Sequence, residues 1–563
     1  MIHWYDIDFW GIERLHKIFS FEIMDSMVFN RLDFWLFFIF IMMVFSFLHK
    51  QQLMRSFFIT AVSLFIYYKT SGFFVLLMVL SITVNFALGK WIFRSQSDKA
   101  RKWIIALCAT FNVFFLAYFK YALFFTKSFN ELFQTKYEIW NQFALWGNGW
   151  FGDHTFETMI LLPAGVSFFT FQSISYVVDI YRKEIPPVKN YFDYAFYVTY
   201  FPHVIMGPIV KARDFIPQIY KPFQLDRATF SASVFLIMKG LAKKMILADL
   251  IALQFIDRVV DSPESYPGFV SILAMWGYSL QIYGDFSGYT DIAIGLSRLM
   301  GFELLPNFNS PYKANSVADF WRRWHISLGS WLRSYLYIPL GGNQKGSIGT
   351  YVMTLVIFMF LTFITGWYEL IFVYLGLMTL YIIGVLISPN FKKYMHRDLN
   401  LLITMIVGGL WHGSTQNFMI WGMMNGAALV VYNYWKRISP YENSSWWIVH
   451  FWKIFITFNF ITFTRIWFRL PEDDEPLKML NHIWLHFNFS FQMLWNVIWN
   501  YGPVFIVMFI GFFTHWMPQR WKDGIVNLFT RMPISVQLVG VSIGILLLYQ
   551  AASFFKPFVY LEF

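Results

Sequence analysis

Apolar residues run in long blocks along the whole chain, and short polar, glycine or proline breaks separate the blocks. A helix needs about 20 apolar residues to cross a hydrocarbon core about 30 Å thick. Several blocks approach that length, while others are too short to cross upright. The blocks lie at 34–48, 56–69, 72–93, 103–125, 156–180, 192–210, 229–252, 267–300, 348–365, 370–388, 399–411, 417–433, 447–463, 500–514 and 534–552. The pattern predicts an all-α, polytopic integral membrane protein with roughly a dozen crossings and some re-entrant or interfacial helices.

Three regions depart from this pattern. Residues 126–157 and 470–499 mix charges with tryptophan and tyrosine, which suits amphipathic helices that lie in the membrane interface. The region around 201–220 contains three prolines, so we expect a broken helix there. No internal repeat or soluble domain is evident, and we predict one integral-membrane domain.

Composition and charge support the membrane interpretation. The chain is 57% hydrophobic and only 14% charged, whereas soluble domains carry about a quarter charged residues. Its net charge is +11, and the basic residues cluster in polar breaks such as 49–55 and 94–102. This is the positive-inside pattern, so both breaks are expected to face the cytoplasm. Anionic lipid headgroups are a sufficient partner for the charge, and we expect no nucleic acid partner.

The sequence also excludes several kinds of chemistry. The single cysteine, Cys108, rules out disulfide frameworks and cysteine-rich zinc sites. It lies in an apolar run, where a thiol forms little thiolate, so we expect a small apolar filler and no nucleophile. No HExxH spacing, G-x-S-x-G elbow or phosphate-binding loop occurs in the sequence, and we expect no metal site.

The stretch 317–343, VADFWRRWHISLGSWLRSYLYIPLGGN, places charged side chains among tryptophans. A charged residue at bilayer depth costs about 2.5–3.5 kcal/mol on insertion scales. The charged members of the stretch are Asp319, Arg322, Arg323 and Arg333. We expect them to face protein, water or a ligand.

The tryptophans of this stretch would line up if it formed one continuous helix. Trp321, Trp324, Leu328 and Trp331 are spaced i, i+3, i+7 and i+10. This spacing puts them on one stripe with His325 beside it. Pro339 and the glycine pair at 341–342 are then expected to end the element. Two interpretations stay open: an interfacial helix whose arginines reach lipid phosphates, or an element that faces a cavity.

A second candidate site is the stretch 406–426, IVGGLWHGSTQNFMIWGMMNG. Its His412 follows an apolar run and is flanked by glycines, which allow close approach of backbones. Among the 12 histidines, His325, His412 and His203 are the ones embedded in apolar surroundings. An ionisable residue inside a membrane is a functional hypothesis by default. The alternative, a neutral histidine bonded to a backbone carbonyl, stays open.

Two aspartates form a third candidate. Asp285 and Asp291 are six residues apart and do not share a helix face, so a paired-carboxylate device is not expected. We expect both to act as polar contacts between helices or to line a path for water.

Taken in order, these stretches resemble the membrane-bound O-acyltransferase (MBOAT) family. The resemblance is nearest to the branch of bacterial alginate O-acetyltransferase and teichoic-acid D-alanyl transferase. The close matches are GYTDIAIGLSRLMGF, FNSPYKA, DFWRRWHISLGSWLRSYLYIPLGGN and GGLWHG, with weaker ones in MGPIVKARDFIPQ and IWFRLPE. The likeness covers 27–470, which implies an amphipathic extension at 1–26. The remainder, 471–563, is then a C-terminal interfacial segment with the last transmembrane helices.

The resemblance implies a fold and a set of roles. The family fold is a ring of helices around a tunnel that crosses a thinned membrane. The family's essential histidine corresponds to His412, and its second polar position corresponds to His325. The residues assigned to substrate binding are Trp411, Asp319, Trp324, Arg322, Arg323, Asp285 and Asn425. The chain differs from common family residues at Ser334, Asn425 and His203, which leaves the core chemistry in place.

Acyl transfer needs a base for the hydroxyl proton and a group that stabilises the oxyanion. We expect His412 to be the base, because burial favours the uncharged imidazole. We expect His325 to position the acceptor or to donate to the oxyanion, and Arg322 and Arg323 to hold phosphates of a donor or of lipids.

The predicted function is therefore membrane O-acyl transfer at a bacterial cytoplasmic (inner) membrane. The acyl group that we expect to be transferred is acetyl. The donor would be acetyl-CoA or an acyl carrier protein thioester, with no permanently bound cofactor. The acceptor would be an extracytoplasmic polysaccharide, reached directly or through a periplasmic partner protein. Two alternatives stay open: D-alanyl transfer from a carrier protein, and a proton-coupled transporter that uses His325, His412 and Asp285. The sequence shows no pseudo-symmetric halves, which counts against the transporter.

Overall fold

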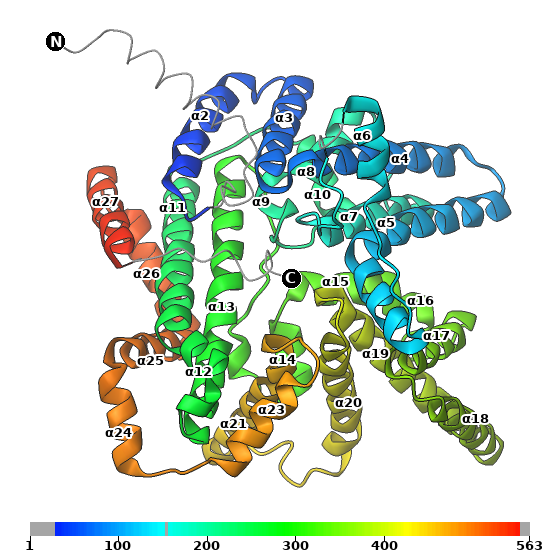
Figure 1. The fold of residues 1–563 in the computed structure, drawn as a ribbon. Coiled ribbons are helices and arrows are strands. Elements are labelled where there is room, and N and C mark those ends of the chain that lie inside the picture. The colour runs from blue at the N-terminus through cyan, green and yellow to red at the C-terminus, as the bar shows by residue number, and fades with distance from the viewer. Residues whose placement is uncertain (1–28, 153–155, 552–563) are drawn as a thin grey trace. The chain divides into compact units, whose positions relative to one another are not determined.

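The computed structural model describes residues 29–152 and 156–551, and its regular structure within these ranges is entirely helical (Figure 1). The all-α class is confirmed. The expected amphipathic extension at 1–26 lies outside the described residues.

The described residues form two compact units, and each is treated separately. Within the described residues, the first unit comprises 29–119, 140–152, 156–237 and 292–304. The second unit comprises 120–139, 238–291 and 305–551. Three of the five boundaries fall inside helices, namely α5, α11 and α13. The domain limits expected from the sequence remain predictions.

Mostly short helices build the first unit around the pairs α3–α8 and α4–α7. Its helices are α2 (Leu32–Leu48), α3 (Gln52–Ser71), η1 (Gly72–Phe74), α4 (Val75–Arg94), α5 (Asp98–Phe133), α6 (Gln142–Phe151), α7 (Val166–Tyr181), α8 (Tyr191–Thr199), α9 (Phe201–Val204), α10 (Ala212–Ile219) and α11 (Arg227–Ala242). The broken helix expected around 201–220 is confirmed, because α8, α9 and α10 are separate short helices in this region.

The second unit contains both stretches singled out for their histidines. Its helices after α11 are η2 (Lys243–Leu250), η3 (Ala252–Ile256), α12 (Asp257–Asp261), η4 (Pro263–Ser265), α13 (Gly268–Leu299), η5 (Pro311–Lys313), α14 (Val317–Arg323), α15 (Ile326–Leu332), η6 (Arg333–Tyr337), α16 (Ile338–Leu340), α17 (Ile348–Thr365), α18 (Glu369–Ile387), α19 (Pro389–His412), α20 (Gln416–Ile438), α21 (Trp447–Thr464), α22 (Ile466–Arg469), α23 (Glu475–Leu485), α24 (Phe491–Asn500), α25 (Gly502–Trp516), α26 (Gln519–Arg531) and α27 (Ile534–Ala551).

Within 29–152 and 156–551, five helical stretches are long and apolar enough to cross a membrane, or seven if two bent pairs each form one span. The five are Gln52–Arg94, Asp98–Phe133, Ile348–Thr365, Glu369–Ile387 and Trp447–Arg469, and the bent pairs are α24–α25 and α26–α27. The polytopic class is confirmed, but the number is below the dozen expected. Several apolar blocks fold into shorter helices that bury polar side chains, such as Gln172 and Asp179 on α7.

Helices α19 and α20 are the most extensively packed helix pair of the second unit, and they lie side by side (Figure 1). Glycines lie at their contact. A Cβ atom added at Gly409 would overlap the Phe418 carbonyl oxygen and lie 3.1 Å from the Cα of Gly422. A Cβ atom at Gly422 would lie 3.2 Å from the Cα of Gly409. The two backbones therefore touch, as small residues allow in membrane helices. This contact fixes the end of α19, where His412 lies.

We expect Gly409→Ala to destabilise the protein by about 1–3 kcal/mol, because the added methyl group meets backbone atoms that cannot rotate away. The matched control is Gly408→Ala on the same helix. Its Cβ atom would meet only the Leu332 side chain, at 3.2 Å, and that side chain can move. Thermal unfolding in detergent should give a lower midpoint for Gly409→Ala alone. Equal midpoints for the two variants would contradict this account of the α19–α20 contact.

Candidate active site

The stretch around His325 is broken into two short helices. Helix α14 ends at Arg323, Trp324 is extended, and His325 has a left-handed backbone with φ +46° before α15 begins. The single tryptophan stripe expected across 321–331 is therefore wrong. A helix stripe requires continuous helical backbone, and the left-handed residue redirects the chain at that point.

Asn307 holds this break from the loop that precedes η5. Its side-chain oxygen accepts a hydrogen bond from the Ser327 amide at 3.0 Å and lies 3.3 Å from Nδ1 of His325. Its backbone carbonyl accepts from the Ile326 amide at 3.0 Å. One buried asparagine therefore accepts hydrogen bonds from the first two backbone amides of α15 and also orients the His325 imidazole.

The end of this stretch follows the sequence prediction. The chain continues through a π-helical turn at η6 and the short helix α16, which contains Pro339. It then stops at Gly341 and Gly342, which have φ values of +116° and +57°. Both values lie in the region that glycine adopts without a steric penalty.

His325 and His412 come together in the second unit. Their ring centroids are 6.1 Å apart, and both side chains are buried, with 1% and 4% exposure. Trp411 lies against both rings, at 5.7 Å from His325 and 4.8 Å from His412. Trp421 and Phe468 enclose His412 further, at 5.2 and 5.3 Å. The imidazoles thus face one another inside an aromatic shell.

Helix α5 secures the C-terminal end of α19. The Lys120 ammonium donates to the Trp411 carbonyl, and the Tyr121 hydroxyl donates to the Leu410 carbonyl. The last carbonyls of a helix have no partners within it and carry partial negative charge, so a cation is favourable there. Sequence reasoning missed both residues. The available signal was one lysine inside the apolar block 103–125.

A small cavity of about 10 Å³, roughly the room that one water molecule needs, adjoins His412. Its lining residues are Ile282, Phe320, Trp321, Trp324, His412, Trp421, Asn425, Ile461, Thr464, Arg465 and Phe468. Five of the eleven lining residues are phenylalanine or tryptophan, and His412, Asn425, Thr464 and Arg465 provide the polar groups. Of the residues assigned from the sequence, Trp324, His412 and Asn425 line it.

Arg465 is the lining residue that sequence reasoning missed. It follows α21 directly and is only 3% exposed. Its guanidinium lies over Trp324 at 4.5 Å from the ring centroid, with Tyr312 and Phe320 at 5.3 and 5.7 Å. The available signal was an isolated arginine directly after the apolar block 447–463, where a charge is costly.

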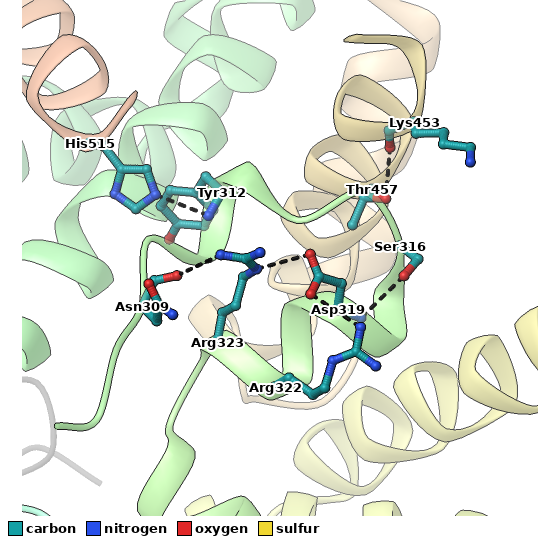
Figure 2. A network of polar contacts seen from close by, with 9 residues as sticks. All are labelled: Asn309, Tyr312, Ser316, Asp319, Arg322, Arg323, Lys453, Thr457 and His515. Atoms are coloured by element: carbon teal, nitrogen blue, oxygen red, sulfur yellow. Dashed lines mark hydrogen bonds and ion pairs between the residues drawn. The ribbon is translucent and has the colours of Figure 1, made fainter. Parts of the chain in front are cut away.

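The charged residues of α14 form ion pairs with one another, as Figure 2 shows. The carboxylate of Asp319 pairs with Arg322 at 3.2 Å and with Arg323 at 2.9 Å. Arg323 also donates to the Asn309 carbonyl at 3.3 Å. None of these four residues lines the cavity beside His412. The side chain of Arg322 is 72% exposed and remains accessible to an anion.

Asp285 and Asp291, both on α13, form ion pairs with lysines of the π-helical segment η2. Asp285 lies 2.6 Å from Lys244, which also pairs with Asp249 at 2.9 Å. Asp291 lies 2.7 Å from Lys243. The aspartates therefore join neighbouring helices as polar contacts, and Asp285 is not part of the cavity wall.

Two further predicted positions lie in the first unit. His203 is buried, and its Nδ1 lies 3.0 Å from the side-chain Nε2 of Gln172. The Cys108 thiol is buried and donates weakly to the Asn85 side-chain oxygen at 3.4 Å. The expectation of a small, buried cysteine is confirmed. In the described part of the chain, no group of three or more histidine, cysteine or acidic side chains could hold a metal ion.

Comparisons with known proteins agree with the motifs. The sequence model of the membrane-bound O-acyltransferase family matches residues 103–398, which include His325 but end before His412. The chain is 34% identical to a probable alginate O-acetylase of Azotobacter vinelandii over 364 residues, 64% of this chain and 59% of that protein. It is 29% identical to a peptidoglycan O-acetyltransferase of Helicobacter pylori over 457 residues, 77% of this chain and 74% of that protein.

A more distant similarity links the chain to a teichoic acid D-alanyltransferase of Bacillus subtilis. The identity is 26% over 309 residues, 53% of this chain and 66% of that protein. The chain spans between 52% and 59% of the length of the first four alginate O-acetylases that it matches. The family expected from the motifs is confirmed.

The left-handed backbone at His325 gives a prediction that separates backbone strain from side-chain loss. His325→Ala and His325→Gly both remove the imidazole, but alanine keeps the steric penalty of positive φ and glycine relieves it. We expect His325→Gly to be more stable by about 1 kcal/mol, because the relief of strain exceeds glycine's greater entropy loss. Thermal unfolding in detergent checks the order. An alanine variant at least as stable as the glycine variant would contradict the backbone assignment.

Proposed function

The chain belongs to the membrane-bound O-acyltransferase family, and on that premise we propose that it is a membrane O-acyltransferase. It moves an acyl group, acetyl in our assignment, from a cytosolic thioester to hydroxyls of an extracytoplasmic polysaccharide. One observation carries this proposal: His325 and His412 are buried with rings 6.1 Å apart, and His412 opens onto a small cavity.

His412 serves as the general base in this proposal. A base must be uncharged before it accepts a proton, and an aromatic enclosure favours the neutral imidazole. The anchors at Lys120 and Tyr121 hold the end of α19, so the ring keeps its position during turnover. His325, oriented by Asn307, positions the acceptor hydroxyl or donates to the oxyanion.

The donor in this proposal is acetyl-CoA or an acyl carrier protein thioester, which acts as a substrate and not as a bound cofactor. Such donors carry phosphates. The exposed guanidinium of Arg322 suits one of them, although Asp319 shares its charge. A lipid phosphate has the same chemistry and would bind there equally well.

Acetyl is favoured over D-alanyl because relatives at 34% and 29% identity are named as O-acetylating enzymes of alginate and peptidoglycan, whereas the D-alanyltransferase is 26% identical. By the same names, the acceptor is a cell-envelope or exported polysaccharide, reached directly or through a periplasmic partner protein. The proposed location is the bacterial inner membrane. The transporter alternative loses its basis, because the family carries out acyl transfer.

The D-alanyl alternative keeps one observation in its favour, the similarity to the teichoic acid D-alanyltransferase. Purified protein in liposomes separates the donors when it is offered radiolabelled acetyl-CoA in one sample and a D-alanylated carrier protein in another. Release of free CoA in the first sample alone supports acetyl transfer. Discharge of the carrier protein alone would replace acetyl by D-alanyl.

Removal of the base should abolish transfer. We expect His412→Ala to lower polysaccharide acetylation by about 100-fold or more, the range for loss of a general base. The matched control is His396→Gln, because His396 is also buried in the second unit but bonds to Tyr351 and Tyr381 away from the cavity. The measurement is ester-linked acetate in polysaccharide from cells that produce each variant. A correctly inserted His412→Ala protein with unchanged acetylation would overturn the proposal.

A further inference from the structure

Arg465 carries a charge that none of the described acidic side chains neutralises. No carboxylate in residues 29–152 and 156–551 forms an ion pair with it, although it is only 3% exposed. Its Nη1 donates to the Tyr312 hydroxyl at 2.8 Å, and that hydroxyl donates in turn to the Ser279 carbonyl. A buried charge without a counter-ion is costly, so the position calls for a functional explanation.

Aromatic rings hold the guanidinium without neutralising it. Trp324 lies under the guanidinium at 4.5 Å, and Tyr312 and Phe320 complete the box. Cation–π contacts stabilise the buried cation, but the net positive charge remains. The same arginine lines the cavity that contains His412 and Asn425. The cavity therefore combines a base with a fixed positive charge.

We propose that Arg465 stabilises the negative oxygen that forms on the acyl carbonyl during transfer. This inference rests on the proposed function. A thioester carbonyl and a hydroxyl are both neutral, so the ground state offers Arg465 no anion at the reacting centre. Negative charge appears there only as the tetrahedral intermediate forms. An interaction made only at that stage speeds the chemical step and leaves substrate binding unchanged.

The reaction balances with the groups present. The hydroxyl proton of the acceptor moves to His412 as the hydroxyl oxygen bonds to the carbonyl carbon, and the carbonyl electron pair moves onto its oxygen beside Arg465. When that pair returns, the carbon–sulfur bond breaks. The leaving thiolate takes the proton from the His412 imidazolium. The products are an ester and a thiol, and no other reactant is needed.

The aromatic rings around Arg465 favour its proposed role as the group that stabilises the oxyanion. Electrostatic interactions are stronger where water is excluded, and a group already held in place needs no reorganisation as charge develops. The hydrogen bond to Tyr312 and the contact with Trp324 fix the guanidinium in this way.

The test compares Arg465→Lys and Arg465→Gln with the unmodified protein in inverted membrane vesicles that contain the polysaccharide. Radiolabelled acetyl-CoA is the donor. We expect Arg465→Gln to lower kcat about 100-fold, the range for loss of an oxyanion donor, with KM for acetyl-CoA and for polymer within about twofold. Arg465→Lys should retain more activity, because it keeps the charge. A raised KM with retained kcat would assign Arg465 to ground-state binding of a substrate anion and overturn the inference.

Tyr312→Phe decides the question if both arginine variants fail to fold. It keeps the ring and the cation but removes the hydrogen bond that holds the guanidinium. We expect kcat several-fold lower with KM unchanged, and an unfolding midpoint lowered modestly because two buried hydrogen bonds are lost. Unchanged kcat would overturn the inference. If unmodified and His412→Ala vesicles incorporate equally little label, the proposed function itself fails. If unmodified vesicles are active and Arg465→Gln matches them, only this inference fails.

Discussion

The backbone contact between α19 and α20 is the constraint on which the candidate site depends. Gly409 and Gly422 have no side chains, so the helices approach until main-chain atoms meet. That approach sets where α19 ends, and His412 is its last residue. Donors from Lys120 and Tyr121 then cap the same helix end. A ring placed by main-chain contact has less freedom than one placed by flexible side chains.

The polar groups buried in the second unit divide into two classes. In the first class, Lys244 forms ion pairs with Asp285 and Asp249, and Asp319 forms ion pairs with the two arginines of α14. Such groups join helices in surroundings where unpaired charge is costly. The cavity polar groups His412 and Arg465 lie instead among aromatic rings. The contrast between ion-paired groups and polar groups set among aromatic rings distinguishes the site from the rest of the unit.

The fold class and the two histidines could be predicted from the sequence, because long apolar blocks and ionisable residues within them are local signals. The break at His325 could not. Periodicity assumes continuous helix, and the bond that holds the break comes from Asn307, 18 residues earlier. The donor from Lys120 is 291 residues from its acceptor, and no local pattern reveals such pairing. Arg465 was visible as a lone charge, but its aromatic partners were not.

The aromatic wall of the cavity has a consequence for chain-length selectivity in the proposed reaction. Indole and phenyl rings such as those of Trp324, Trp421 and Phe468 are rigid, and here they pack against one another and the core. A longer acyl tail would have to displace packed rings, which protein interiors resist. In the proposed reaction, any acyl group that enters must move these rings, and the energetic cost rises with the length of its tail.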